Sequence, residues 1–165
     1  MSEALRVGIG LDVGEKRIGV ARGDLAVKLA SPLAPIMNDQ TNAPLLQIWQ
    51  LMRDSDADFI VVGLPRNAHG EETKQSELVR QFVARLQTVF QREQLSVELF
   101  FQDESLTSVR AEEFLRGRKN FQERMLRDGT LDSEAATIIL GDFLNSGQVV
   151  PLSIVKPTSA GGEHE

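Results

Sequence analysis

The sequence predicts an α/β fold in which helices flank a mixed β-sheet. Residues 6–24 (RVGIGLDVGEKRIGVARGD) alternate β-branched and small residues on both sides of a turn at Gly14, which indicates a β-hairpin. Residues 58–64 (DFIVVGL) form a continuous apolar run, as in a strand covered on both faces. Residues 73–92 repeat apolar side chains with the period of a helix. A hairpin followed by alternating helices and strands predicts parallel pairing between the first strand and the later ones.

The remaining segments fill in this pattern. Residues 27–37 are expected to form a third strand at a sheet edge, because Pro32 and Pro35 interrupt them. Helices are expected at residues 44–53, where Pro44 suits a first helical position, and at 106–116 and 132–145. Residues 96–101 (SVELFF) are expected to form a strand, and 117–129 an irregular loop. We expect one domain, residues 1–146, followed by a poorly ordered C-terminal tail, residues 147–165.

The composition excludes several kinds of site. The 165 residues include no cysteine, which excludes a disulfide framework, a thiolate nucleophile and a zinc–thiolate site. With only His69 and His164, neither a histidine-rich metal site nor a Ser-His-Asp triad is expected. Metal chemistry would therefore depend on oxygen ligands, which points to Mg²⁺ or Mn²⁺. No charge-free apolar run reaches the roughly 18 residues of a membrane span, so we expect a cytoplasmic protein without a membrane partner.

Asp12 is an unusual residue for the end of the first strand. Acidic side chains have poor strand propensity, and an unpaired carboxylate is costly to bury. Gly8, Gly10 and Gly14 surround it and leave room for another group to approach the backbone. A carboxylate on a rigid strand beside open space suits a metal or phosphate site. The alternative is an aspartate that only bonds the amides of the turn.

Acidic residues from two further parts of the chain are expected at the same edge of the sheet. Asp103 and Glu104 follow the strand at residues 96–101, and Asp132 begins the last helix. Because ligands bind at the carboxyl ends of strands in open α/β sheets, three carboxylates could meet there, held together by cations. Two Mg²⁺ ions about 4 Å apart could activate water and stabilise a leaving oxygen. The alternatives are an N-cap role for Asp132 and turn roles for the acidic pair, of which at most one member faces the site.

Four ordered blocks carry a resemblance to a known family. They are GLDVGEKRIGVA (residues 10–21), IVVGLPRNAHGEE (60–72), QDESLTSVRAEEFL (102–115) and LDSEAATIILGDFL (131–144). With them the chain resembles the YqgF (RuvX) family of pre-16S rRNA nucleases, also described as Holliday-junction-resolvase-like. The resemblance implies an RNase H-like fold and a metal-dependent endonuclease that processes the 5′ end of pre-16S rRNA in ribosome biogenesis. It also implies that the catalytic and metal-binding acids are Asp12, Glu104 and Asp132. A structure-selective DNA resolvase is the alternative, because the same metal chemistry serves both.

Two positions depart from the pattern of that family. Ser105 stands where the family usually has an arginine after the acidic pair, which removes a charge that could contact phosphate or steady Glu104. His69 stands where the family commonly has an aspartate before the glycine of the loop. We expect His69 to be an exposed loop residue and not a base.

Basic residues suggest a nucleic-acid partner despite a net charge of −6. Residues 116–127 contain five basic side chains, one acid and Phe121, so this segment could grip phosphates and stack a base; the alternative is a solvated loop. The predicted contacts are Lys16, Arg17, Arg66, Arg116, Arg118 and Lys119. Arg66 is the preferred single phosphate contact, because the resemblance places the GLPRN loop near the active edge. An RNA precursor is favoured over branched DNA.

Two other classes of protein compete with the nuclease. Asp12-Val13-Gly14 also resembles the phosphate-binding turn of actin-like and sugar-kinase ATPases, but those proteins need two such domains and 165 residues supply one. A binding module without catalysis, acting on RNA or a transcription complex, is the other. The intact acids count against this module, whereas Ser105 and His69 count for it. No feature of the sequence determines the oligomeric state.

Overall fold

The computed structural model describes residues 6–104, 130–146 and 151–155, and for residues 130–132 and 151–155 it describes only the backbone. The strands are β1 (Val7–Val13), β2 (Arg17–Asp24), β3 (Leu29–Met37), β4 (Phe59–Leu64), β5 (Val97–Asp103) and β6 (Pro151–Val155). The helices are α1 (Ala43–Ser55), α2 (Lys74–Arg92) and α5 (Thr130–Ser146).

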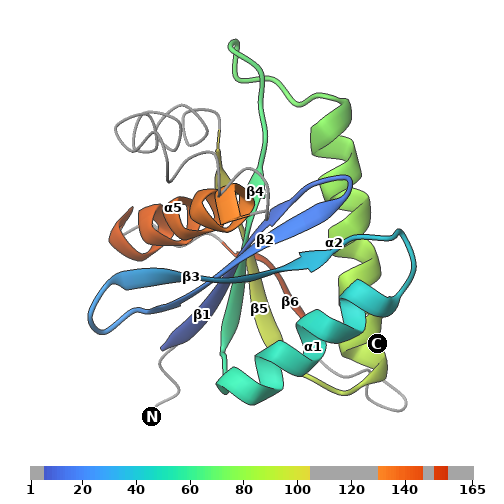
Figure 1. Ribbon diagram of the computed structural model, residues 1–165, viewed down its shortest axis with the longest axis vertical. Helices are drawn as coiled ribbons and strands as arrows, with labels where there is room; N and C mark the ends of the chain where they lie inside the picture. The colour runs from blue at the N-terminus through green and yellow to red at the C-terminus, as the bar shows by residue number, and fades with distance from the viewer. Residues whose placement is uncertain (1–5, 105–129, 147–150, 156–165) are drawn as a thin grey trace, which may run out of the picture.

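The strands form one six-stranded mixed sheet in the order β3-β2-β1-β4-β5-β6 (Figure 1). The first three strands are an antiparallel meander, β4 and β5 run parallel to β1, and β6 returns antiparallel to β5. The predicted combination of an antiparallel hairpin with parallel strands is therefore confirmed. Because β1, β4 and β5 are parallel, their carboxyl ends lie at one edge of the sheet.

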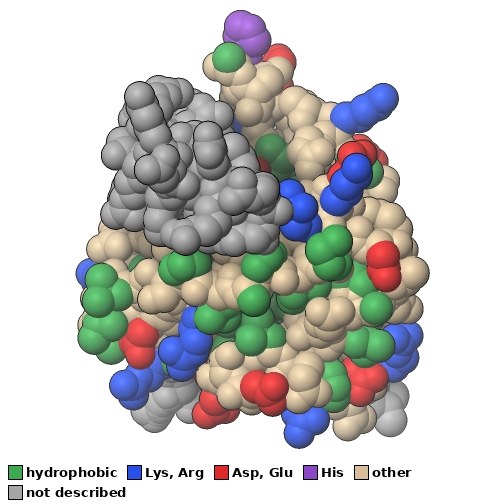
Figure 2. Space-filling view, viewed as in Figure 1, with side chains coloured by type: hydrophobic (Ala, Val, Ile, Leu, Met, Phe, Trp, Pro, Cys, Tyr) green, Lys and Arg blue, Asp and Glu red, His purple; other side chains and the backbone are tan. Residues whose placement is uncertain are grey.

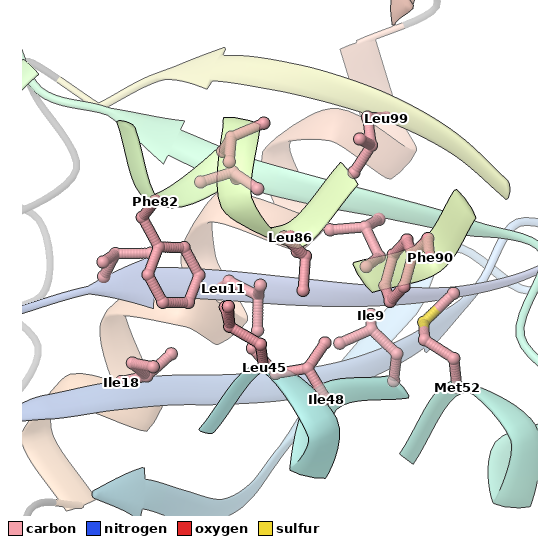
Figure 3. Close-up of a cluster of buried hydrophobic side chains, with 14 of the residues drawn as sticks. Ile9, Leu11, Ile18, Leu45, Ile48, Met52, Phe82, Leu86, Phe90 and Leu99 are labelled. Carbon is pink, nitrogen blue, oxygen red and sulfur yellow. The ribbon is translucent and has the colours of Figure 1, made fainter. Parts of the chain in front are cut away.

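Helices cover both faces of the sheet, with α1 and α2 on one face and α5 on the other (Figure 1). The larger core lies under α1 and α2, where Leu45 and Leu86 meet the β1 side chains Ile9 and Leu11 (Figure 3). All four side chains have an exposed fraction of 0%. Burying each such side chain contributes about 1.5–3 kcal/mol, so this layer holds the sheet and the two helices together.

The second face of β1 carries almost no side-chain bulk. Side chains alternate along a strand, so Gly8, Gly10 and Asp12 share the face that α5 covers. A Cβ atom at Gly10 would lie 2.8 Å from Cβ of Leu140 and 3.0 Å from the carbonyl oxygen of Ala136. The glycine therefore lets α5 lie directly on the backbone of the strand that carries Asp12.

The edge strand β3 leaves hydrophobic side chains in solvent, among them Leu29 and Met37. Figure 2 shows the face that includes β3 and α1, and several hydrophobic side chains are exposed on it. Pro32 and Pro35 lie within this strand, as expected for an edge, because proline cannot donate to another ladder.

The structure corrects the expected course of the last quarter of the chain. Residues 147–165 were expected to be a poorly ordered tail, but Pro151–Val155 form β6. The last helix was expected to start at Asp132, but α5 already includes Thr130 and Leu131, so Asp132 is not its N-cap. The predicted helix at 106–116 and loop at 117–129 lie outside the described residues. Within the described part of the chain, no helix is both long and apolar enough to cross a membrane.

Candidate active site

Asp12 is a half-buried residue next to the end of β1. The turn that follows is closed by a hydrogen bond from Gly14 N–H to the Arg17 carbonyl, 2.9 Å. Two side chains from other elements hold the same turn: Asn38 Nδ2 donates to the Gly14 carbonyl at 2.9 Å, and Gln75 Nε2 donates to the Val13 carbonyl at 3.2 Å. The turn after Asp12 is thus held by the residue that follows β3 and by a residue of α2.

Glu104 follows β5, and its N–H donates to the Leu64 carbonyl at the end of β4, 3.2 Å. The side chain lies against Gly63, where a Cβ atom would approach Oε1 of Glu104 to 2.7 Å. Only glycine at this position leaves room for the Glu104 carboxylate where it lies.

The carboxyl groups of Asp12 and Glu104 share a hydrogen bond. Burial raises the pKa of Glu104 from its ordinary value to about 8, and the negative charges of Asp12 and Asp103 add to the effect. Near neutral pH without a cation, the two carboxyl groups therefore hold one proton between them. β1 and β5 thus bring two carboxyl groups together, as expected for part of an acidic site.

The donor set fits a small divalent cation. The two groups that converge are carboxyl groups, and Mg²⁺ and Mn²⁺ prefer such oxygen ligands. A cation would replace the shared proton and relieve the repulsion that raises the Glu104 pKa. No group of three or more acidic or histidine side chains that could hold a metal occurs within the described residues, which do not include the side chain of Asp132.

The backbone of Asp132 lies in the first turn of α5, and a neighbouring residue locates that turn. The Ser133 hydroxyl accepts a hydrogen bond from Val20 N–H at 3.2 Å. Val20 follows Gly19, which is the β2 partner of Asp12 in the sheet. Paired residues of an antiparallel ladder have Cα atoms about 4.5–5.5 Å apart, so the first turn of α5 starts beside Asp12. The side chain of Asp132 lies outside the described residues.

Asp103 and Glu104 have different principal partners. The Asp103 carboxylate is 3.9 Å from Nε of Arg66 and is about half exposed, whereas Glu104 bonds Asp12. The two acids therefore contact different side chains, although the charge of Asp103 still acts on Glu104. Arg66 also donates to the Gly70 carbonyl at 3.1 Å. Its contact with Asp103, the last residue of β5, places its guanidinium at the carboxyl edge of the sheet.

The loop after β4 is organised by Asn67. Its Oδ1 accepts from the N–H groups of His69 and Glu71, both at 2.9 Å. At the far end of the loop, Glu72 forms an ion pair with Arg80 on α2. His69 is exposed, as predicted. The loop thus has its own hydrogen-bonded structure, with Arg66 at its base.

The other predicted contacts fall into two groups. Lys16 is exposed and Arg17 half-buried at the tip of the β1–β2 hairpin, close to the end of the strand that carries Asp12. Arg116, Arg118 and Lys119 lie outside the described residues, as does Ser105.

Sequence comparison identifies the family. Residues 6–146 match the family described as RuvX, Holliday junction resolvase. The chain belongs to the RuvX family. A Roseiflexus relative named "Putative pre-16S rRNA nuclease" is 43% identical over 145 residues, which cover 88% of this chain and 97% of the relative. A Synechocystis relative with the same name is 38% identical over 83% of this chain and 86% of its own length. The family assigns this chain to the enzymes that hydrolyse phosphodiester bonds.

Two solved structures have a fold similar to that of this RuvX-family chain. Thermus thermophilus RuvC, in complex with a Holliday junction substrate, superposes with a TM-score of 0.51 at 15% identity and covers 89% of this chain and 99% of its own. The fowlpox virus Holliday junction resolvase superposes with a TM-score of 0.50 at 12% identity, over 85% of this chain and 98% of its own. At such low identity the likeness concerns the fold alone. It confirms the RNase H-like sheet.

Several residues that shape the candidate site of this RuvX-family chain were not among the predicted site residues. Gly63 had a recognisable signal, because a glycine inside an apolar strand often marks the close approach of another group. Gln75, Asn38 and Ser133 had none, because their hydrogen bonds join segments 24 to 113 residues apart.

Proposed function

We propose that this protein is a divalent-metal-dependent endonuclease that processes the 5′ end of a pre-16S ribosomal RNA precursor. The observation that carries the proposal is the convergence of the Asp12 and Glu104 carboxyl groups at the carboxyl edge of the sheet. Membership of the RuvX family supports the hydrolytic chemistry, and the names of the relatives support the RNA substrate.

Asp12, Glu104 and Asp132 would hold Mg²⁺ or Mn²⁺. Such ions, when bound, supply Lewis-acid stabilisation of the phosphate and a water nucleophile at neutral pH. Glu104 must first release the proton that it shares with Asp12, and the rigid ends of β1 and β5 keep the two carboxyl groups facing the same point.

The basic side chains would position the nucleic acid. Arg66 lies beside the acidic edge, held by the Gly70 carbonyl and by Asp103, so it can contact the phosphate next to the scissile bond. Lys16 and Arg17 would extend the contact along the β1–β2 hairpin, and Arg116, Arg118 and Lys119 would add further phosphate contacts. A ribosomal RNA substrate supports a cytoplasmic location.

A DNA junction resolvase is the second candidate. The family description favours it, and the fold neighbour from Thermus thermophilus carries a Holliday junction in its structure. The two candidates share the same acids and differ in the shape of the nucleic acid that they accept.

Cleavage of two substrates by the purified protein separates these candidates. A labelled pre-16S rRNA fragment and a four-way DNA junction are incubated with Mg²⁺ or Mn²⁺, with Ca²⁺, and with a chelator. We expect the RNA to be cut with Mg²⁺ or Mn²⁺ only, because Ca²⁺ takes more ligands at longer distances. Preferential cutting of the junction would favour the resolvase, and cutting in the presence of the chelator would exclude the metal-dependent mechanism.

Asp12→Asn provides the loss-of-function control for this assay. It should lower cleavage at least about 100-fold, because removing a direct ligand should exceed the 10–100-fold loss typical of an outer-sphere partner. Asp54→Asn, on the exposed surface of α1, makes the same chemical change away from the site and should leave cleavage unchanged. If wild type binds RNA with no cleavage under any metal condition, the protein is a binding module instead.

A further inference from the structure

Two polar side chains are fully buried among the described residues, Ser76 and Ser133. Both lie in the first turn of a helix that starts near the acidic edge. Ser76 belongs to the capping box of α2 and donates to the Pro65 carbonyl, which accounts for its burial. Ser133 instead forms hydrogen bonds with two strands of the sheet. These bonds do not cap or stabilise its own helix.

The hydroxyl of Ser133 is inserted between two paired strands. Val20 on β2 pairs with Leu33 on β3, next to an irregularity in the ladder between Ile18 and Val20. Ser133 Oγ accepts from Val20 N–H at 3.2 Å and donates to the Leu33 carbonyl at 2.7 Å. A β-bulge leaves backbone groups without their ladder partners, and this hydroxyl replaces them.

This bridge lies close to Asp12. Val20 follows Gly19, the β2 partner of Asp12, and Val20 itself pairs with Leu11. One turn further along α5, Ala136 has an exposed fraction of 0%, and its carbonyl lies over Gly10. The first two turns of α5 are therefore held against the strands that present Asp12, by a hydrogen-bonded bridge at Ser133 and by close packing at Ala136.

We propose that Ser133 is a positioning residue for the acidic site. Its bridge between Val20 and Leu33 fixes the first turn of α5 on the sheet and thereby sets the backbone of the adjacent Asp132 relative to Asp12 and Glu104. This inference rests on the proposed function, because it takes Asp132 as a ligand of the cation. A hydroxyl that served the fold alone would affect stability without affecting the affinity for a metal ion.

The test compares metal affinity and stability in matched variants of the full chain. Melting temperature is measured without nucleic acid across a Mn²⁺ titration, and the half-saturating Mn²⁺ concentration is obtained from the rise. Ser133→Ala should raise that concentration about tenfold, the lower end of the effect of outer-sphere partners. Val89→Ala, buried in α2 on the opposite face, should lower the melting temperature while leaving the half-saturating concentration unchanged. Ser133→Cys keeps nearly the same volume with a weak donor and acceptor and should give an intermediate shift if Ser133→Ala does not fold.

Asp132→Asn distinguishes failure of this inference from failure of the proposed function. If Asp132→Asn weakens Mn²⁺ binding and both Ser133 variants bind as wild type does, the positioning role is overturned and the metal site stands. If Asp132→Asn binds Mn²⁺ as wild type does, the role of Asp132 as a ligand is itself overturned. In the double variant, Ser133→Ala should add little to the effect of Asp132→Asn, because both changes act through one ligand.

Discussion

Glu104 shares its surroundings with two other carboxyl groups, Asp12 and Asp103, while burial removes the water that would solvate its charge. These causes raise its pKa to about 8. Either a proton or a bound cation would relieve this repulsion. Metal binding should consequently release a proton and strengthen as the pH rises.

The raised pKa predicts how the stability of the metal-free protein depends on pH. In the unfolded chain Glu104 loses its proton at its ordinary value of 4.5, whereas in the folded protein it keeps the proton up to about pH 8. Between these values the folded state binds more protons, so the free energy of unfolding falls as the pH rises. We expect this residue to contribute about 2 kcal/mol to that fall, since each pKa unit corresponds to about 1.4 kcal/mol and solvent reduces the full effect. Thermal melts from pH 5 to pH 8.5 in chelator measure the fall.

Glu104→Gln should remove this part of the pH dependence and melt at a higher temperature than wild type at pH 8 without metal. The variant keeps the size of the side chain and the ability to donate a hydrogen bond to Asp12. Glu93→Gln, exposed after α2, is the charge-matched control and should keep the wild-type slope. Equal slopes in wild type and Glu104→Gln would show that this carboxyl group does not hold the proton.

Gly63→Ala tests the space that the acidic pair occupies. The new Cβ would lie 2.7 Å from Oε1 of Glu104 and 2.5 Å from Cδ1 of Ile139, so the carboxylate and α5 must both move. We expect a loss of about 1–3 kcal/mol in stability together with a severe loss of cleavage. Gly141→Ala on α5 is the matched control, because a Cβ there meets no described atom within 4 Å, and it should raise stability by about 0.5–1 kcal/mol. Normal cleavage by Gly63→Ala would show that Glu104 does not need its present position.

At the scale of an element, the loop between β4 and α2 brings Arg66 to the edge of the sheet. The loop is tied down at both ends, by Ser76 bonding the Pro65 carbonyl and by the ion pair of Glu72 with Arg80. Arg80 also lies 5.0 Å from the ring centre of Phe101 on β5, which joins α2 to the strand that leads to Glu104. Arg66 is thus presented by a loop with fixed ends.

Arg66→Ala should weaken nucleic-acid binding uniformly and reduce its salt dependence. Loss of one phosphate contact should lower the slope of log affinity against log salt by about 0.7 for a single strand. Fluorescence anisotropy from 50 to 250 mM salt (roughly the range in which such slopes are resolved) measures this effect. Arg92→Ala, in the last turn of α2 at the other end of the helix, should leave the slope unchanged. An unaltered slope in Arg66→Ala would shift the search for the phosphate contact to Arg116, Arg118 and Lys119.

Strands and helices with a strong periodic pattern could be predicted from the sequence, whereas long-range contacts could not. The alternation around Asp12 and the apolar run of β4 indicated the sheet, and the rule for carboxyl ends of parallel strands brought Asp12 and Glu104 to one edge. The bridge from Ser133 has no local signal, because a serine in a helix has the same sequence appearance whether or not it bonds a strand. The start of α5 was misplaced because Asp132 has the chemistry of a cap, although the helix already includes Thr130.

At the scale of the whole molecule, β6 is the last strand of the sheet and covers the outer side of β5. It was missed because five residues starting with a proline, near a run of small and polar residues, resemble a tail. Its pairing with β5 runs from Val97↔Val155 to Phe100↔Pro151. Glu104 directly follows the carboxyl end of β5, so β6 supports the strand that positions one member of the carboxyl pair.

Truncation after Ser146 tests that support. Without β6, strand β5 becomes an unprotected edge and loses the hydrogen bonds of its outer side, each worth about 0.5–1.5 kcal/mol. We expect a loss of about 2–4 kcal/mol and a fall in melting temperature of about 5–15 °C for a chain of this size. A chain truncated after Val155 keeps β6, and its melting temperature should fall by much less. Thermal melts of both truncations beside the full chain, with light scattering to detect association through the uncovered β5 edge, make the measurement. Equal melting temperatures for the chain ending at Ser146 and the full chain would show that the sheet is stable without its sixth strand and that the domain ends at α5.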